Sequence, residues 1–229
     1  AVEAERQLRC VAYSSGQGRF EVAWFERAVE EGRGLTLVEE YRGPWPTFLG
    51  VDLGVQQKEK HDKTAFFCMA VDIFGKGTRL PLAMFEERLT GPAIVRRLKD
   101  FKARYNPVTM VENNAAQDFI RQFATDAGIE TQPFTTGKNK ANPDFGVPSL
   151  GVELQQGLWI LPSADATSQQ KAMTWRTQCL NWSPGQHVGD LLMASWFARE
   201  AARLNSFAKA FTVPVETQPS GWAPASNDQ

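Results

Sequence analysis

The sequence has few cysteines, and none of them is spaced for a shared site. Cys10, Cys68 and Cys179 are odd in number and far apart, and no CxxC pair occurs. A disulfide framework needs paired cysteines, and a structural zinc site usually needs closely spaced thiolates. The sequence therefore indicates neither, and we expect three buried, reduced thiols.

Long apolar runs are also missing. No stretch approaches the roughly 18 apolar residues of a membrane-spanning helix, and the N-terminus lacks the charged-then-apolar pattern of a secretory signal. A nucleotide-binding P-loop is absent too, because no Lys followed by Ser or Thr closes the Gly-rich stretch SSGQGR. We expect an intracellular, soluble protein that has no membrane partner and no P-loop ATPase of its own.

Positive charge is not in excess either, since the net charge is -1. Nucleic-acid-binding proteins usually carry a basic domain or face, so any such contact must come from local patches. One group of cations on an expected helix has an ordinary interpretation as a solvated helix face, whereas two others flank acidic motifs. The three groups are Lys58, Lys60 and Lys63; Arg96, Arg97, Lys99, Lys102 and Arg104; and Lys138 with Lys140 in TTGKNK.

The chain does contain enough apolar residues for one sizeable core, with 229 residues of which 42% are hydrophobic. Residues 1–47 differ in composition from the rest, with the Gly-rich stretch SSGQGR and the break RGPWP. We expect a linker or appended segment there, with a helix over 19–31 and a short strand in LTLVEEY. A compact domain is expected over 48–211. Residues 212–229 are proline-rich and have few core formers, so we expect a disordered or partner-bound tail.

The expected elements of that domain follow the order of a mixed α/β sheet. Strands are predicted over 48–53, 63–73, 78–86, 108–112 and 129–134, with a short further strand in GLWILP. Helices are predicted from 90–92 onwards, between Asn114 and Gly128, over 165–180 and over 189–204. The antiparallel start excludes a uniformly parallel, doubly wound fold. We therefore predict an α/β fold with a mixed sheet of five or more strands, three antiparallel strands leading, flanked by helices.

Three acidic residues lie at the ends of these elements. Asp52 ends strand 48–53, Glu112 ends strand 108–112, and Asp190 opens the last helix. A right-handed crossover between these two strands would make them parallel neighbours, with Asp52 and Glu112 at the same end of the sheet. Neighbouring strands lie about 4.8 Å apart, so the two side chains would be close together. Each acid alone could be an ordinary strand-end or helix-start carboxylate. Together they predict an oxygen-ligand site for Mg²⁺ or Mn²⁺, with two ions expected.

Two further side chains could assist this site. Asp62 precedes Lys63 and could bind a second metal ion, orient a metal-bound water or pair with the lysine. His187 lies shortly before Asp190 and could help it to bind metal, or it could be an ordinary hydrogen-bonded surface residue.

The motifs resemble those of the nuclease domain of the large terminase subunit of tailed bacteriophages, a member of the RNase H-like superfamily. The similarity spans Phe48 to about Ala202 and rests on GVDLG with DKTA downstream, VTMVENNAAQDFIRQF, TTGKNK, GLWILP and GDLLMASWFA. The resemblance implies that Asp52, Glu112 and Asp190 are metal ligands, with Asp62 a weaker addition. One departure is that many members have consecutive acids at the third site, whereas Leu191 follows Asp190 here.

The expected activity is hydrolysis of DNA phosphodiester bonds by a two-metal mechanism. We expect Asp52 to bridge the ions, and Lys138 and Lys140 to neutralise DNA phosphates, with Lys58, Lys60 and Lys63 as further candidates. Since no base-reading motif is visible, cutting should depend little on sequence.

The resemblance further implies genome packaging in the host cytoplasm. The implied partners are double-stranded DNA, a terminase ATPase domain, the small terminase subunit and the portal protein. The chain begins with Ala and contains no motor, so we expect either the C-terminal portion of a two-domain protein or a separate nuclease, and the abrupt opening favours the first.

Three alternatives stay open. An actin-like or sugar-kinase phosphotransferase would use the same VDLG turn, but it needs a second Gly-rich loop and a duplicated domain, which the sequence does not supply. A Holliday-junction resolvase of the same superfamily would share the metal ligands and differ in substrate. A non-catalytic DNA- or capsid-docking domain would be indifferent to metal.

Overall fold

The fold is given by a computed structural model of the chain, which describes residues 20–54, 63–112, 118–136, 140–142, 146–184 and 189–210. Several residues that the sequence singled out therefore lie outside the described residues, as do residues 1–19 of the N-terminal segment and the whole predicted tail. These are Cys10, Lys58, Lys60, Asp62, Lys138 and His187.

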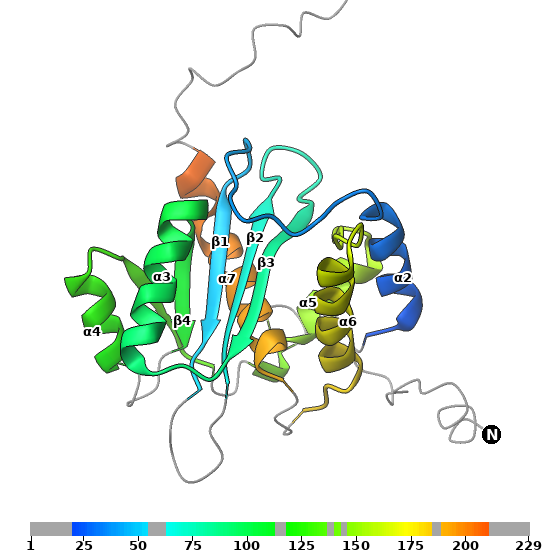
Figure 1. Cartoon of the computed structure of the whole chain (residues 1–229). Coiled ribbons are helices and arrows are strands. Elements are labelled where there is room, and N and C mark those ends of the chain that lie inside the picture. Colours follow the sequence, from blue (N-terminus) through cyan, green and yellow to red (C-terminus); the bar gives the residue numbers. More distant parts are fainter. Residues whose placement is uncertain are drawn as a thin grey trace, which may run out of the picture.

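A five-stranded mixed sheet in the order β3-β2-β1-β4-β5 forms the centre of the molecule (Figure 1). Its strands are β1 (Thr47–Asp52), β2 (Thr64–Val71), β3 (Arg79–Glu87), β4 (Val108–Glu112) and β5 (Thr131–Phe134). The first three are antiparallel neighbours, and β4 lies parallel to both β1 and β5. The predicted mixed sheet with three leading antiparallel strands is thus confirmed.

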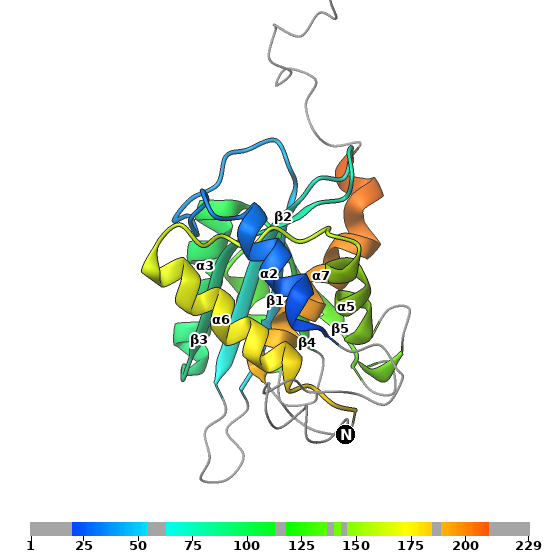
Figure 2. The same ribbon diagram turned by 90° about the vertical axis from the view of Figure 1, so that its right-hand side faces the viewer.

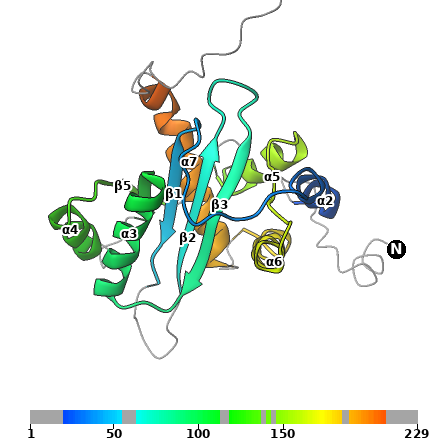
Figure 3. The same ribbon diagram turned by 45° about the horizontal axis from the view of Figure 1, so that its top comes forward.

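Helices cover both faces of this sheet (Figure 3). They are α2 (Val22–Glu31), α3 (Gly91–Tyr105), α4 (Asp118–Asp126), α5 (Pro148–Gln155), α6 (Ala166–Leu180) and α7 (Asp190–Ala210). α3 and α4 lie on one face and α7 on the other, with α2, α5 and α6 on the same side as α7. Trp175 of α6 contacts Phe67 of β2 directly, and Figure 2 shows α2 and α6 in front of the strands. This double cover explains why β1 and β2 are apolar and buried at almost every position.

The alternation of side chains along β1 divides the core into two clusters. Leu49 and Val51 pack in the cluster that contains Leu98 of α3. Phe48 packs in the other cluster with Phe197 of α7. Asp52 is four residues after Phe48, so its side chain belongs to the α7 face of the sheet.

The contact between α7 and β1 is very close at Gly50. A Cβ atom there would lie 1.9 Å from the carbonyl oxygen of Ala194 and 2.4 Å from the backbone nitrogen of Ala198. Small residues make this approach possible, and Ala194, Ser195 and Ala198 of α7 are all buried. α7 extends to Ala210, six residues beyond its expected end at 204.

Two expected helices, α3 and α6, begin close to their predicted positions, with differences at the caps. Thr90 is the N-cap residue of α3 by position, yet its side chain makes no capping hydrogen bond. The C-cap residue of α3 is Asn106, which has a left-handed backbone conformation with φ 48°. Asp165 does cap α6, because its side chain accepts a hydrogen bond from the amide of Ser168 at 2.7 Å.

Two expected strands are wrong. LTLVEEY forms no strand; its backbone follows the edge of β3 through a single bond, from the amide of Val38 to the carbonyl of Leu82 at 3.0 Å. GLWILP makes only an isolated bridge between Trp159 and Arg79. Each segment makes only one or two backbone hydrogen bonds to β3, instead of the continuous ladder of a strand. Neighbouring residues within each segment bond to helices instead, Tyr41 to α3 and Leu161 to α2.

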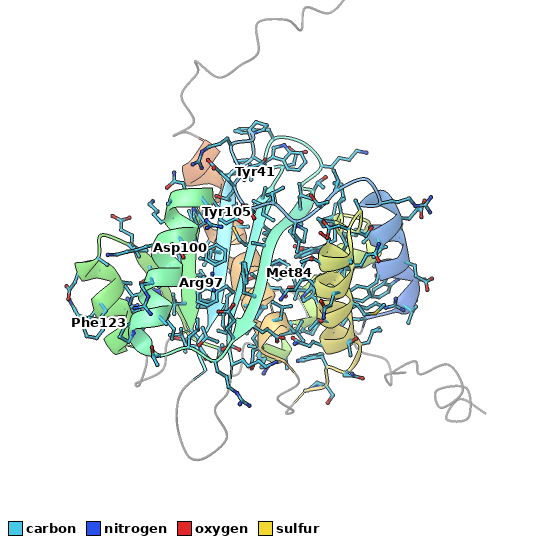
Figure 4. All side chains as sticks on the ribbon, viewed as in Figure 1. Tyr41, Met84, Arg97, Asp100, Tyr105 and Phe123 are labelled. Atoms are coloured by element: carbon cyan, nitrogen blue, oxygen red, sulfur yellow. The ribbon has the colours of Figure 1, made fainter. Side chains whose placement is uncertain are left out.

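Residues 20–47, part of the predicted N-terminal segment, pack on the same core as the sheet. Phe25 and Ala28 of α2 are buried on the α7 side, and Tyr105 of α3 donates a hydrogen bond to the carbonyl of Val38 at 2.5 Å. Figure 4 shows Tyr41 and Tyr105 together at one end of α3. The division of the chain into domains stays a prediction.

Cys68 and Cys179 are buried free thiols, as expected. Among the described helices, none combines the length and the apolar character that a bilayer crossing would require.

Candidate metal centre

Asp52 and Glu112 occupy equivalent positions at the ends of neighbouring parallel strands. The pairing of β1 with β4 runs to Val51 opposite Val111, so the next residue of each strand is an acid. Adjacent strands lie about 4.8 Å apart, and the alternation along each strand points both side chains to the α7 face. The structure therefore brings together the first two predicted site residues.

Burial dominates the electrostatics of Asp52, which is 8% exposed. Desolvation raises the pKa of its carboxyl group well above the ordinary value of 3.8, and the negative charges of Glu112 and Asp190 raise it further. A hydrogen bond with Glu112 acts in the same direction, while the charge of Lys140 lowers the pKa. Three other predicted site residues thus lie within electrostatic reach of Asp52.

Asp190 reaches this group through the placement of α7. Ala194 and Ala198 contact β1 at Gly50, and Asp190 is one turn before Ala194, about 6 Å along the helix axis. Asp52 is two residues after Gly50, about 6.6 Å along the strand. Figure 1 shows the light-orange start of α7 at the same end of the sheet as the arrowhead of β1.

Two side chains that the sequence analysis did not single out hold the start of α7. Glu86, at the end of β3, accepts hydrogen bonds from Gln178 of α6 at 2.6 Å and from the amide of Leu191 at 3.3 Å. Gln178 in turn accepts a bond from the amide of Leu192 at 2.9 Å. The only local signal for Glu86 was an acidic pair at a strand end, and nothing near Gln178 indicated its role.

The segment after β5 also contacts the site. Thr136 donates a hydrogen bond to Glu112 at 3.1 Å, which orients that carboxylate. Lys140 follows four residues later and acts electrostatically on Asp52. Both residues belong to TTGKNK, the stretch expected beside the acids.

The other predicted cations are distributed differently. Lys63 is exposed and precedes β2, whose Ala65 pairs with Asp52, so it lies at the same end of the sheet. Arg97 is on α3, on the opposite face, where it pairs with Glu87 at 2.8 Å and lies over the ring of Phe85. The remaining cations of α3 are exposed on that face: Arg96, Lys99, Lys102 and Arg104.

The chemistry of this donor set fits a hard divalent cation, because it offers carboxylate oxygens and one of them is buried. Within the described ranges, however, no three acidic, histidine or cysteine side chains are close enough to enclose an ion as they are placed. Asp52 is nevertheless coupled electrostatically to two acids, Glu112 and Asp190. The sheet brings Asp52 and Glu112 side by side, and Asp190 lies at the start of α7, at the same end of the sheet (Figure 1).

No protein-family model matches this sequence, and no curated protein sequence matches it significantly. Solved structures do match in fold. The large terminase nuclease of thermophilic phage G20c with bound magnesium is 16% identical, with a TM-score of 0.57, over 82% of this chain and 98% of that chain. The same nuclease has also been solved with zinc and with cobalt.

Two further terminases are similar. The human cytomegalovirus terminase nuclease domain is 14% identical, with a TM-score of 0.55, over 79% of this chain and 94% of that domain. The HK97 bacteriophage large terminase is 13% identical, with a TM-score of 0.51, over 77% of this chain but 43% of that protein. The chain therefore has the RNase H-like fold that was predicted, and its structure is similar to the nuclease domains of viral large terminases.

Proposed function

We propose that this chain is a divalent-metal-dependent endonuclease that hydrolyses DNA phosphodiester bonds with little sequence specificity. The observation that carries the proposal is the burial of Asp52 beside two further acids. An ionised carboxylate in that position costs several kcal/mol to desolvate unless a cation or donors compensate it. The similarity to terminase nucleases, one of which binds magnesium, supports a metal ion as that cation.

The roles of the side chains follow from their positions. We assign Asp52, the acid on which the other two act, to both ions, and Glu112 and Asp190 to one ion each. Mg²⁺ or Mn²⁺ suits oxygen ligands. Two such ions, when bound there, would activate a water and stabilise the leaving 3′ oxygen of the phosphodiester.

Thr136 and Lys140 prepare the same site for its substrate. Thr136 fixes the Glu112 carboxylate through its hydrogen bond. Lys140 offsets part of the negative charge around Asp52, and its ammonium group is available to neutralise a DNA phosphate. Lys138 and Lys63 would extend this contact, with Lys58 and Lys60 as further candidates, while Asp62 and His187 stay candidates for assisting the metal.

The biological setting that we propose is genome packaging in the host cytoplasm, where the nuclease cuts concatemeric viral DNA. The HK97 large terminase is more than twice as long as the part that this chain spans, which supports a nuclease portion acting with a separate ATPase region. The small terminase subunit and the portal protein are the further partners in this proposal.

Plasmid digestion tests the proposed activity. We expect the chain to nick and linearise supercoiled DNA with Mn²⁺ or Mg²⁺, and chelation to stop it. Asp52→Asn, Glu112→Gln and Asp190→Asn should each abolish cutting, because each removes a ligand charge while keeping the shape. Asp100→Asn is the matched control, since Asp100 is exposed on α3 on the opposite face (Figure 4).

The outcomes separate the alternatives. Cutting that survives one of the three substitutions removes that residue from the site. Strong preference for a four-way junction over linear duplex supports a resolvase, and DNA binding without metal-dependent cutting supports a docking domain.

A further inference from the structure

The first turn of α7 is held by side chains from two other elements. Glu86 of β3 accepts a hydrogen bond from the amide of Leu191 at 3.3 Å, and Gln178 of α6 accepts one from the amide of Leu192 at 2.9 Å. The two side chains are joined by a bond from the Gln178 amide nitrogen to Glu86 at 2.6 Å. We call these two residues the α7 clamp.

The clamp satisfies backbone groups that a helix cannot satisfy itself. The first amides of an α-helix have no partner within the helix, and they are usually capped by a residue immediately before it. Here the acceptors come from positions 86 and 178, so the cap also ties α7 to β3 and α6. Gly189 leaves the space for it, because a Cβ atom at that position would lie 2.3 Å from the side-chain carbonyl carbon and oxygen of Gln178.

The clamp lies in the same row of the sheet as the acidic site. Asp52 pairs with Ala65 of β2, and Ala65 pairs with Glu86 of β3. Directly paired residues on neighbouring strands point to the same face, so Glu86 and Asp52 both point toward α7. The clamp therefore holds the helix start at the level of Asp52, and Asp190 is the residue adjoining Leu191.

A second contact fixes α7 one turn further along. At Gly50 the backbone of Ala194 and Ala198 lies directly on β1, which sets the distance of the helix from the sheet. A contact at one point leaves the helix end free to pivot, whereas two points fix its direction. The clamp is the second point, and it is the one nearer to Asp190.

From this geometry we propose that Glu86 and Gln178 are positioning residues that hold Asp190 at the metal centre; this rests on the proposed function. Both ends of the Gln178 amide are used, one as donor and one as acceptor, so alanine at either position breaks the connection between β3 and the helix. Glu86→Gln keeps an oxygen acceptor and the length of the side chain while removing the charge. It therefore separates the hydrogen bonds from the electrostatics.

The experiment compares Glu86→Ala, Gln178→Ala and Glu86→Gln with Glu87→Ala. Glu87 is the matched control, because it is the next residue of the same strand but pairs with Arg97 of α3 on the opposite face. Amide hydrogen exchange at Leu191 and Leu192 reports the clamp itself. Isothermal titration calorimetry with Mn²⁺ measures the affinity of the metal centre independently of DNA cleavage.

We expect both alanine variants to exchange the amides of Leu191 and Leu192 at least about tenfold faster, and to bind Mn²⁺ about tenfold more weakly, as for other residues that orient metal ligands. Glu86→Gln should have amide exchange rates close to those of the wild type. Glu87→Ala should match the wild type in both exchange rates and Mn²⁺ affinity. Glu86→Ala added to Asp190→Asn should cause no further loss of Mn²⁺ affinity, because the clamp acts through Asp190.

Three results would overturn the proposal. Unchanged exchange in both alanine variants means that the clamp does not hold the helix start. Faster exchange with unchanged Mn²⁺ affinity, when Asp190→Asn does weaken binding, means that the clamp is structural only. If the wild-type chain neither binds Mn²⁺ nor cuts DNA, the proposed function is wrong, and so is the positioning role that rests on it. Should Glu86→Ala fail to fold, Gln178→Ala carries the same test.

Discussion

Asp52 and Glu112 end two parallel strands at the same level, and a hydrogen bond joins their carboxyl groups on the α7 face of the sheet. Two acids so placed repel each other when both are ionised. The arrangement weakens the metal-free fold, and it is the kind of local cost that functional sites retain.

Replacing Asp52 by asparagine should therefore stabilise the metal-free protein. Asparagine keeps the shape and the hydrogen-bonding capacity but removes the buried charge and its repulsion with Glu112 and Asp190. We expect the free energy of unfolding at pH 7 to rise by about 1–2 kcal/mol in urea denaturation. Asp100→Asn on the surface of α3 should change it little, and a loss of stability in Asp52→Asn would show that the carboxylate is compensated without metal.

The contribution of Asp52 to the stability of the metal-free protein should fall as pH rises above 3.8, the ordinary pKa of the aspartate side chain. Burial raises the pKa of Asp52 in the folded state, so over that interval the unfolded chain releases the proton while the folded chain keeps it. The loss is complete once pH exceeds the folded-state pKa.

Thermal unfolding between pH 4 and 8, with and without Mn²⁺, measures this dependence. The difference between the wild type and Asp52→Asn should carry the downward slope, and the stabilisation by Mn²⁺ should grow with pH, because the ion competes with the proton. A difference between the two proteins that is flat with pH would contradict the account.

Gly50→Ala should destabilise the fold strongly. Its Cβ atom would lie 1.9 Å from the carbonyl oxygen of Ala194, so α7 must move away from β1. We expect a loss of about 3 kcal/mol in urea denaturation, together with weaker Mn²⁺ binding, since Asp190 moves with the helix. Gly34→Ala is the control, because nothing lies within 4 Å of its added Cβ atom.

Lys140→Gln should weaken DNA binding and reduce its salt dependence. If Lys140 contacts one phosphate, the slope of the logarithm of affinity against the logarithm of salt concentration should fall by about 1. Fluorescence anisotropy with a labelled duplex in Ca²⁺ measures this. Lys99→Gln on α3 is the comparison, and an equal effect of both substitutions would mean that DNA does not approach the acidic end of the sheet in particular.

The strands and helices that carry the three acids could be predicted because each is an apolar run that an acidic residue ends or begins. Asp52 and Glu112 follow continuous buried runs, and Asp190 precedes a stripe of small residues. Their side-by-side placement required only that two parallel strands be neighbours, which the crossover rule supplies.

The roles of Glu86 and Gln178 could not be predicted in this way. Glu86 belongs to an acidic pair at the end of β3, and only the register with β2 separates it from Glu87, which points to the other face. Gln178 is one polar residue among many on α6. Their contact with α7 depends on how three separate elements pack, and no local pattern encodes it. The same holds for LTLVEEY, whose alternation favours a strand although the packing of its neighbours limits it to one bond with β3.

The most direct test of the metal centre is the anomalous scattering of Mn²⁺ in crystals of the wild-type chain. The account predicts a peak, or a pair of peaks about 4 Å apart, bounded by the carboxylates of Asp52, Glu112 and Asp190. The peaks should be lost in Asp52→Asn crystals grown under the same conditions. Manganese bound elsewhere in the wild type, with no density between these three acids, would contradict it.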